Sequence, residues 1–201
     1  PWKPSSTRPG RQNFLNLYLI TADNKPLLGK GHILASEQFE LPFSTPQPKV
    51  KTSALPSLVT SDSGNTITVK GKSFAVNFDK TTGTISSFIF EGHSFLEQGP
   101  LPNFRRAPID NDVGNKMFVK CKPWYDASEN RKVVSVILDD SDKKAVKVSV
   151  HYSLPDALSE MIVLYTISGN GNIQVENQLK AGQNLPWIPR LGNNMRLNGT
   201  L

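Results

Sequence analysis

The chain has 201 residues, of which 37% are hydrophobic and 20% charged, and it carries a formal charge of +6. This length fits one extended β domain, or a domain with part of another. No apolar run approaches the ~20 residues that a membrane-spanning helix needs. The basic residues are spread singly or in pairs, whereas a nucleic-acid surface gathers them on one face with aromatic side chains between them. We therefore expect no membrane partner and no nucleic-acid partner.

The cysteine content and the amino terminus leave the compartment unassigned. Cys121 is the single cysteine, so an internal disulfide is excluded, and no Cys or His lies near it at metal-ligand spacing. Residues 1–6 lack the charged and apolar regions of a signal peptide, and the chain does not begin with Met. We expect the chain to be a piece of a longer protein.

Short alternating segments separated by Gly and Pro favour β structure from the start of the chain. Residues 13–21 are rich in Leu, Ile, Phe and Tyr and predict a well-buried strand, which the turn at 22–26 ends. A second strand is predicted over about 31–41. Four prolines follow within residues 42–61, and because proline lacks the amide hydrogen of a central strand, this stretch predicts an extended interdomain linker.

The alternation becomes regular after the linker. Strands are predicted around Ile67 and Val69 and over 74–78, 85–90, 133–138, 146–152, 161–167 and 173–175. Gly83 stands where a type I turn with a bulge needs a positive φ, and Asn170-Gly171 is a strong hairpin signal. The spacing predicts an antiparallel β-sandwich connected as a simple meander, with no helix of three turns.

Ionisable and amide side chains crowd together in residues 103–115, which have no periodicity and form the candidate functional segment. Asp110, Asn111 and Asp112 resemble the start of a calcium loop, but no bidentate Glu follows at the required spacing. The two carboxylates also suggest a glycosidase acid and nucleophile, although alternate residues of one turn rarely reach the geometry and the separate environments that this chemistry needs. The favoured interpretation is that these groups bind their own backbone and Arg106.

The remaining candidates are scattered. His32, His93 and His151 lie far apart without a Gly-x-Ser-x-Gly nucleophile motif, and we expect them at the surface. Tryptophans stack on sugars or anchor cores, and the latter is the commoner role in a β domain; they are Trp2, Trp124 and Trp187. Residues 198–200, Asn-Gly-Thr, match the glycosylation acceptor pattern.

Residues 106–114, Arg-Ala-Pro-Ile-Asp-Asn-Asp-Val-Gly, resemble the Arg-Ala-Pro-x-Asp-Asn-Asp-x-Gly segment of the large multidomain bacterial β-galactosidases of glycoside hydrolase family 2. Residues 74–86 resemble the strand and hairpin that open the family's C-terminal sandwich domain. Residues 31–39 are similar to the last strand of the preceding immunoglobulin-like domain, and residues 186–197 are similar to the Pro-Arg-x-Gly strand of the sandwich. The resemblance covers nearly the whole chain.

The resemblance implies an all-β chain with three parts. Residues 1–43 would be the last strands of an immunoglobulin-like domain, 44–62 a Pro-rich linker, and 63–201 the first part of a large antiparallel sandwich of the galactose-mutarotase-like type. In that family two glutamates on a (β/α)₈ barrel hydrolyse terminal β-D-galactosides with retention. We expect this chain to lack the catalytic residues, and its partners to be the barrel domain and the galactoside.

The resemblance also implies where the sugar site is approached. The candidates for a loop at its edge are Arg106, Asp110, Asn111, Asp112, Gly114 and Asn115. Gly114 would be the hinge of a mobile loop that runs toward Pro123 and Trp124. Residues 115–118, Asn-Lys-Met-Phe, depart from the family's more usual acidic and hydroxyl residues. The family's magnesium and sodium belong to the barrel, so no metal or cofactor is assigned to this chain.

The parent enzyme would be a homo-oligomer of the bacterial cytoplasm or periplasm. Open ladder edges and an exposed apolar face in a partial sandwich would favour self-association. Two other function classes stay open: a free-standing carbohydrate-binding module, marked by two or three exposed aromatic side chains in line on one sheet face, and a structural β domain, favoured by full internal pairing of Arg106, Asp110 and Asp112.

Overall fold

The computed structural model of the chain describes residues 8–46 and 52–199. The chain divides into two compact units, Pro1–Val50 and Lys51–Leu201. The boundary between the units falls inside the predicted linker of residues 44–62. Trp2 and Thr200, which entered the sequence interpretation, lie outside the described residues.

Unit 1 contains an antiparallel ribbon of β1 (Asn13–Ile20) and β2 (Ile33–Leu41). Leu15, Leu17 and Leu19 share one face of β1, and Phe39 lies opposite Leu15 on the same face. The prediction of a well-buried strand is wrong here, because Leu17 and Leu19 are 50% and 63% exposed. Within the described part of unit 1, the ribbon is not covered by a second sheet layer.

Unit 2 begins with a sheet whose strands follow chain order. After a short 3₁₀ turn at Thr52–Ala54, the sheet runs through β3 (Val59–Ser63), β4 (Thr66–Lys70), β5 (Phe74–Asp79), β6 (Thr84–Phe90) and β7 (His93–Ser94). The sequence did not predict β3, which forms an edge of this sheet and begins inside the predicted linker of residues 44–62. Gly83 has a φ of +70° in the β5–β6 turn, which confirms its predicted conformation.

A second antiparallel sheet contains β9 (Lys132–Asp139), β10 (Ala145–Leu154), β11 (Ser159–Ser168) and β12 (Ile173–Lys180) in the order β12-β11-β10-β9. A 3₁₀ turn at Pro155–Ala157 joins β10 to β11, and the Asn170-Gly171 turn joins β11 to β12, with Gly171 at a φ of +89°. Four consecutive strands thus form a meander, as the alternation predicted.

The pairing of β8 (Leu96–Asn103) with β13 (Gly192–Leu197) departs from the predicted meander. Asn103 lies opposite Gly192. All four strands of the second sheet, β9 to β12, lie between β8 and β13 in the sequence. Backbone packing holds β8 against β6: a Cβ on Gly99 would lie 2.0 Å from the Ile85 carbonyl oxygen. Thr84 Oγ1 also donates to the Pro100 carbonyl at 2.7 Å.

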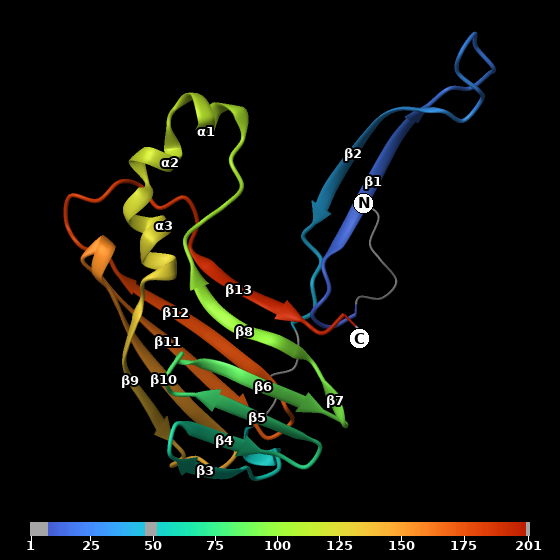
Figure 1. The fold of residues 1–201 in the computed structure, drawn as a ribbon. Helices are drawn as coiled ribbons and strands as arrows, with labels where there is room; N and C mark the ends of the chain where they lie inside the picture. Colours follow the sequence, from blue (N-terminus) through green and yellow to red (C-terminus); the bar gives the residue numbers. More distant parts are fainter. Residues whose placement is uncertain (1–7, 47–51, 200–201) are drawn as a thin grey trace. The chain divides into compact units, whose positions relative to one another are not determined.

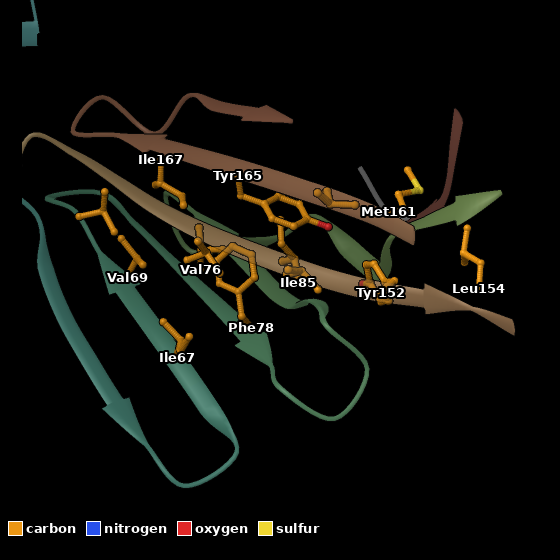
Figure 2. Close-up of a cluster of buried hydrophobic side chains, with 14 of the residues drawn as sticks. Ile67, Val69, Val76, Phe78, Ile85, Tyr152, Leu154, Met161, Tyr165 and Ile167 are labelled. Atoms are coloured by element: carbon orange, nitrogen blue, oxygen red, sulfur yellow. The ribbon is translucent and has the colours of Figure 1, made fainter. Parts of the chain in front are cut away.

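The core lies between the two larger sheets (Figure 2). Alternate residues of β4, β5, β10 and β11 point into it, and the ring centroids of Phe78 and Tyr165 lie 5.1 Å apart. The buried Tyr152 hydroxyl donates to the Gly83 carbonyl at 2.6 Å, so this polar group is satisfied inside the core. Two sheets packed over one apolar layer confirm the prediction of an all-β sandwich.

Three short helices connect β8 to β9 at one end of unit 2 (yellow-green in Figure 1): α1 (Asp110–Gly114), α2 (Met117–Lys120) and α3 (Lys122–Glu129). In the described residues none of them reaches three turns, in line with the sequence. Among residues 8–46 and 52–199, no helix is long and apolar enough to cross a membrane.

Candidate functional site

The candidate segment is partly helical: residues 104–109 have no regular secondary structure, as predicted, whereas Asp110–Gly114 form α1, which corrects the interpretation of all of residues 103–115 as a loop without periodicity. Helix α1 begins where the Asp112 and Val113 amides donate to the Ile109 carbonyl at 2.9 and 3.1 Å. Asp112 Oδ2 in turn accepts the Ile109 amide at 2.9 Å, which satisfies a backbone donor at the helix start. Asp110 and Asp112 in the first turn of α1 also interact favourably with the positive end of the helix dipole.

Arg106 and Asp112 form a two-pronged ion pair at the centre of the segment. Arg106 Nη1 donates to Asp112 Oδ2 at 2.6 Å, and Nη2 donates to Oδ1 at 2.7 Å. This fork-to-fork geometry fixes the orientation of both groups. The hydrogen bonds from Arg106, and then that from the Ile109 amide, hold the pKa of Asp112 below its usual range, and the same carboxylate raises the pKa of Arg106.

The structure brings only some of the predicted site residues together. Asp110 and Asn111 are exposed in α1, and within the described residues their side chains have no hydrogen-bond partner. Asn115 ends α1, and its Oδ1 accepts a hydrogen bond from Lys120 of α2. A structural β domain would be favoured if Arg106, Asp110 and Asp112 were all paired internally. Arg106 and Asp112 are paired, but within the described residues Asp110 is not.

Gly114 occupies the last position of α1 and does not have a positive φ. A Cβ at this position would meet no atom within 4 Å. The left-handed backbone lies two residues later, at Lys116, with a φ of +54°. In the described conformation, the change of direction between α1 and α2 therefore occurs at Lys116.

Helix α3 fastens this segment to the sandwich. Trp124 is 1% exposed, lies 5.4 Å from the Phe104 ring, and donates from Nε1 to the Pro186 carbonyl at 2.8 Å. Ser128 Oγ accepts the Phe104 amide at 2.9 Å. Trp124 is thus the core anchor that the sequence favoured over a sugar-stacking role.

Met117 of α2, Cys121 between the helices and Tyr125 of α3 form a small buried cluster. Burial raises the pKa of both the Cys121 thiol and the Tyr125 phenol. Arg105 lies over the Tyr125 ring at 5.3 Å. The spacing of these buried residues by four positions was a helical signal in the sequence, and Pro123 in the first turn of α3 was a second one.

The other candidates lie apart from the segment. His32 and His93 are exposed, while His151 is half-buried with Nε2 3.9 Å from Glu160 Oε2. Trp187 is 49% exposed, with Lys120 Nζ 5.8 Å from its ring. Residues 8–46 and 52–199 contain no group of three or more His, Cys, Asp or Glu side chains that could hold a metal ion.

Comparison with known proteins relates most of the chain to one family. Residues 70–201 match the family described as "Beta galactosidase small chain". A β-galactosidase of Priestia megaterium is 33% identical over 184 residues, which are 92% of this chain and 18% of that protein. One from Psychromonas ingrahamii is 31% identical over 201 residues, which are 91% of this chain and 19% of that protein. The chain spans about a fifth of the length of these relatives.

Proposed function

This chain belongs to the β-galactosidase small-chain family, and on that premise we propose that it is a non-catalytic sandwich segment of an enzyme that hydrolyses terminal β-D-galactosides. Its relatives carry the name β-galactosidase, and the chain matches a small share of each. The proposed partner is the remainder of the parent enzyme, whose barrel would carry the acid/base and nucleophile glutamates of a retaining mechanism.

The pairing of Asp112 carries the non-catalytic assignment. A retaining pair needs one carboxyl group that stays protonated near neutral pH and another that stays ionised, about 5–5.5 Å apart. Asp112 is committed to Arg106 through both oxygens, and its lowered pKa keeps it ionised. Asp110 is an exposed residue of the same helical turn. This arrangement supports a positioning role for the segment.

We assign the Arg106–Asp112 pair to holding the α1–α2 connection at the edge of the sugar site. The pair fixes the start of α1, and α3 is anchored through Trp124. Residues 114–117 lie between these two fixed points, and Gly114 has free space around its Cα. Gly114 would act as the hinge when the connection moves.

Fragment complementation tests the proposal. The chain alone, a barrel-containing fragment alone, and their mixture are assayed with a chromogenic β-galactoside. We expect activity in the mixture only. Hydrolysis by the chain alone would overturn the non-catalytic assignment, and an inactive mixture in which the two fragments do bind would overturn the proposed role in the enzyme.

Variants of the segment separate positioning from folding. Asp112→Asn in the mixture is expected to lower kcat/KM by about tenfold to a hundredfold, because a misplaced substrate-site segment costs that much. Asp62→Asn, which removes another paired carboxylate far from the segment, is the matched control and should leave kcat/KM unchanged. If both variants assemble with the barrel fragment to the same extent, the loss of kcat/KM does not come from defective assembly. Equal losses of kcat/KM in the two variants would contradict the assignment.

A free-standing carbohydrate-binding module is the alternative, and one observation favours it. Phe14 and Tyr18 lie on the same face of β1 and are 44% and 58% exposed. Exposed aromatic side chains in line on a sheet stack on sugar rings. Retention of the chain on insoluble galactan that Tyr18→Ala abolishes, with no complementation of the barrel fragment, would favour this alternative.

A further inference from the structure

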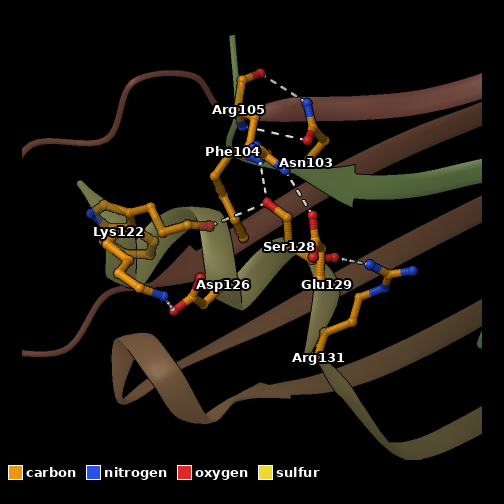
Figure 3. A network of polar contacts seen from close by, with 9 residues as sticks. Asn103, Phe104, Arg105, Lys122, Asp126, Ser128, Glu129 and Arg131 are labelled. Carbon is orange, nitrogen blue, oxygen red and sulfur yellow. Dashed lines mark hydrogen bonds and ion pairs between the residues drawn. The ribbon is translucent and has the colours of Figure 1, made fainter. Parts of the chain in front are cut away.

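A polar cleft of about 430 Å³ lies where β8 and β13 meet the end of α3 and the start of β9. Its volume falls in the range of small-molecule sites. Side chains from four separate parts of unit 2 converge on it, among them Gln98, Asn103, Arg105, Arg131 and Asn194. Figure 3 shows its α3 side, with Arg105 and Arg131 on either side of Glu129.

The charges in the cleft are unbalanced. Arg105 Nη1 binds Glu129 Oε1 at 2.7 Å, which neutralises one guanidinium. Arg131 is half-buried, and within the described residues it has one hydrogen bond, to the Ser128 carbonyl, and no carboxylate partner. Burial lowers the pKa of Arg131, yet a guanidinium stays charged at neutral pH. A half-buried cation without a counter-ion is costly to keep unless an anion binds to it.

Neutral donors stand on the opposite wall of the cleft. Asn103 is buried, and its Nδ2 donates to the Arg105 carbonyl at 2.9 Å and to Asn194 Oδ1 at 3.3 Å. These bonds orient Asn194 so that its own amide group remains available, and the Gln98 side chain has no hydrogen-bond partner in the described part of the chain. Amide donors facing a guanidinium make a set that holds oxygen atoms.

We propose that this cleft binds the carboxylate or phosphate group of a small polar molecule, with Arg131 as the anion-binding residue and Asn194 and Gln98 as donors to its other oxygens. A planar guanidinium holds two oxygens of such a group in parallel. Glu129 does not repel the ligand strongly, because Arg105 already holds it. The site is separate from the Arg106–Asp112 pair, so it does not depend on the galactosidase assignment.

Isothermal titration of the full 201-residue chain at fixed ionic strength tests the site with three probes: inorganic phosphate, galacturonate and galactose. Binding of phosphate or galacturonate without comparable binding of galactose supports the proposal, and which of the two binds more tightly distinguishes a free phosphate from a sugar acid. Galactose binding as tight as galacturonate binding, or no binding by any probe, would overturn it.

Two variants localise the binding. Arg131→Gln is expected to weaken binding by tenfold or more, since hydrogen bonds to a charged group are lost. Lys132→Gln removes the same charge at the neighbouring exposed position and should change affinity by less than twofold. Equal effects of the two variants would show a response to total charge and overturn the site.

A third variant guards against a folding defect in Arg131→Gln. Asn194→Ala truncates an exposed side chain on the other wall and is expected to weaken binding several-fold with unchanged circular dichroism. If Asn194→Ala and Arg131→Gln each bind the probes with unchanged affinity, the proposal is likewise overturned.

Discussion

Strands β1 and β5 both carry large apolar residues at alternate positions on one face, but the two faces differ in burial. In β5, Phe74, Val76 and Phe78 are buried against the second sheet, whereas Leu15, Leu17 and Leu19 of β1 are 42–63% exposed. Alternation therefore identifies a strand and its apolar face, while burial depends on whether another layer packs on that face.

Truncation of a matched aromatic residue in each region is expected to give the largest difference. Phe78→Ala removes a fully buried ring that packs on Tyr165 and should lower the free energy of unfolding of unit 2 by about 3–5 kcal/mol. Phe14→Ala removes a 44% exposed ring and should cost less than about 1 kcal/mol. Urea unfolding followed by tryptophan fluorescence and by circular dichroism measures both, and similar losses would contradict the contrast.

A matched pair of glycines sharpens the comparison at the level of the backbone. Gly99→Ala places a Cβ 2.0 Å from the Ile85 carbonyl oxygen, so β8 must move away from β6, at a cost of about 1–3 kcal/mol. Gly29→Ala in unit 1 meets no atom within 4 Å and should change stability by less than about 0.5 kcal/mol. Thermal unfolding of the two variants is the measurement, and a tolerated Gly99→Ala would contradict the tight β6–β8 approach.

The smallest expected effect is a pH dependence confined to the helical segment. The folded pKa of Asp112 lies below its unfolded value, so its stabilising contribution is complete above about pH 4 and is lost as the pH falls through the folded pKa. Carboxyl ¹³C titration by NMR should show that Arg106→Gln raises the pKa of Asp112.

Asp140 is the internal control for that titration. Its pKa is lowered by hydrogen bonds from Lys143 and then Thr60, which the Arg106 substitution does not touch. An unchanged pKa of Asp112 in Arg106→Gln, or an equal shift at Asp140, would contradict the assignment of the ion pair as the cause.

The sequence predicted the parts of the fold whose signals are local. Strands with strict alternation, such as β5 and β10, were found, and Gly83 takes the positive φ that its turn demanded. Strand β8 was missed because Gly99, Pro100 and Pro102 are poor strand residues, and its pairing with β13 depends on a partner about ninety residues away.

The candidate site was located from the sequence, but its conformation was not. The contact of Asp112 with Arg106 and with a nearby backbone amide follows from short-range geometry, and the structure has both. The three helices were overlooked because each is short, although Met117, Cys121 and Tyr125 repeat at four-residue spacing. The polar cleft that contains Arg131 could not be predicted from the sequence, because its lining residues are brought together only by tertiary packing.

The pairing of Asn103 with Gly192 also sets an order of events during folding. Strands β9 to β12 pair only with their sequence neighbours, so this sheet closes through short loops. Strand β8 has to wait until β13 has been synthesised, and closing so long a loop is entropically slower. Until then its backbone donors and acceptors are free, and we expect the nascent chain to need protection from misassembly during that interval.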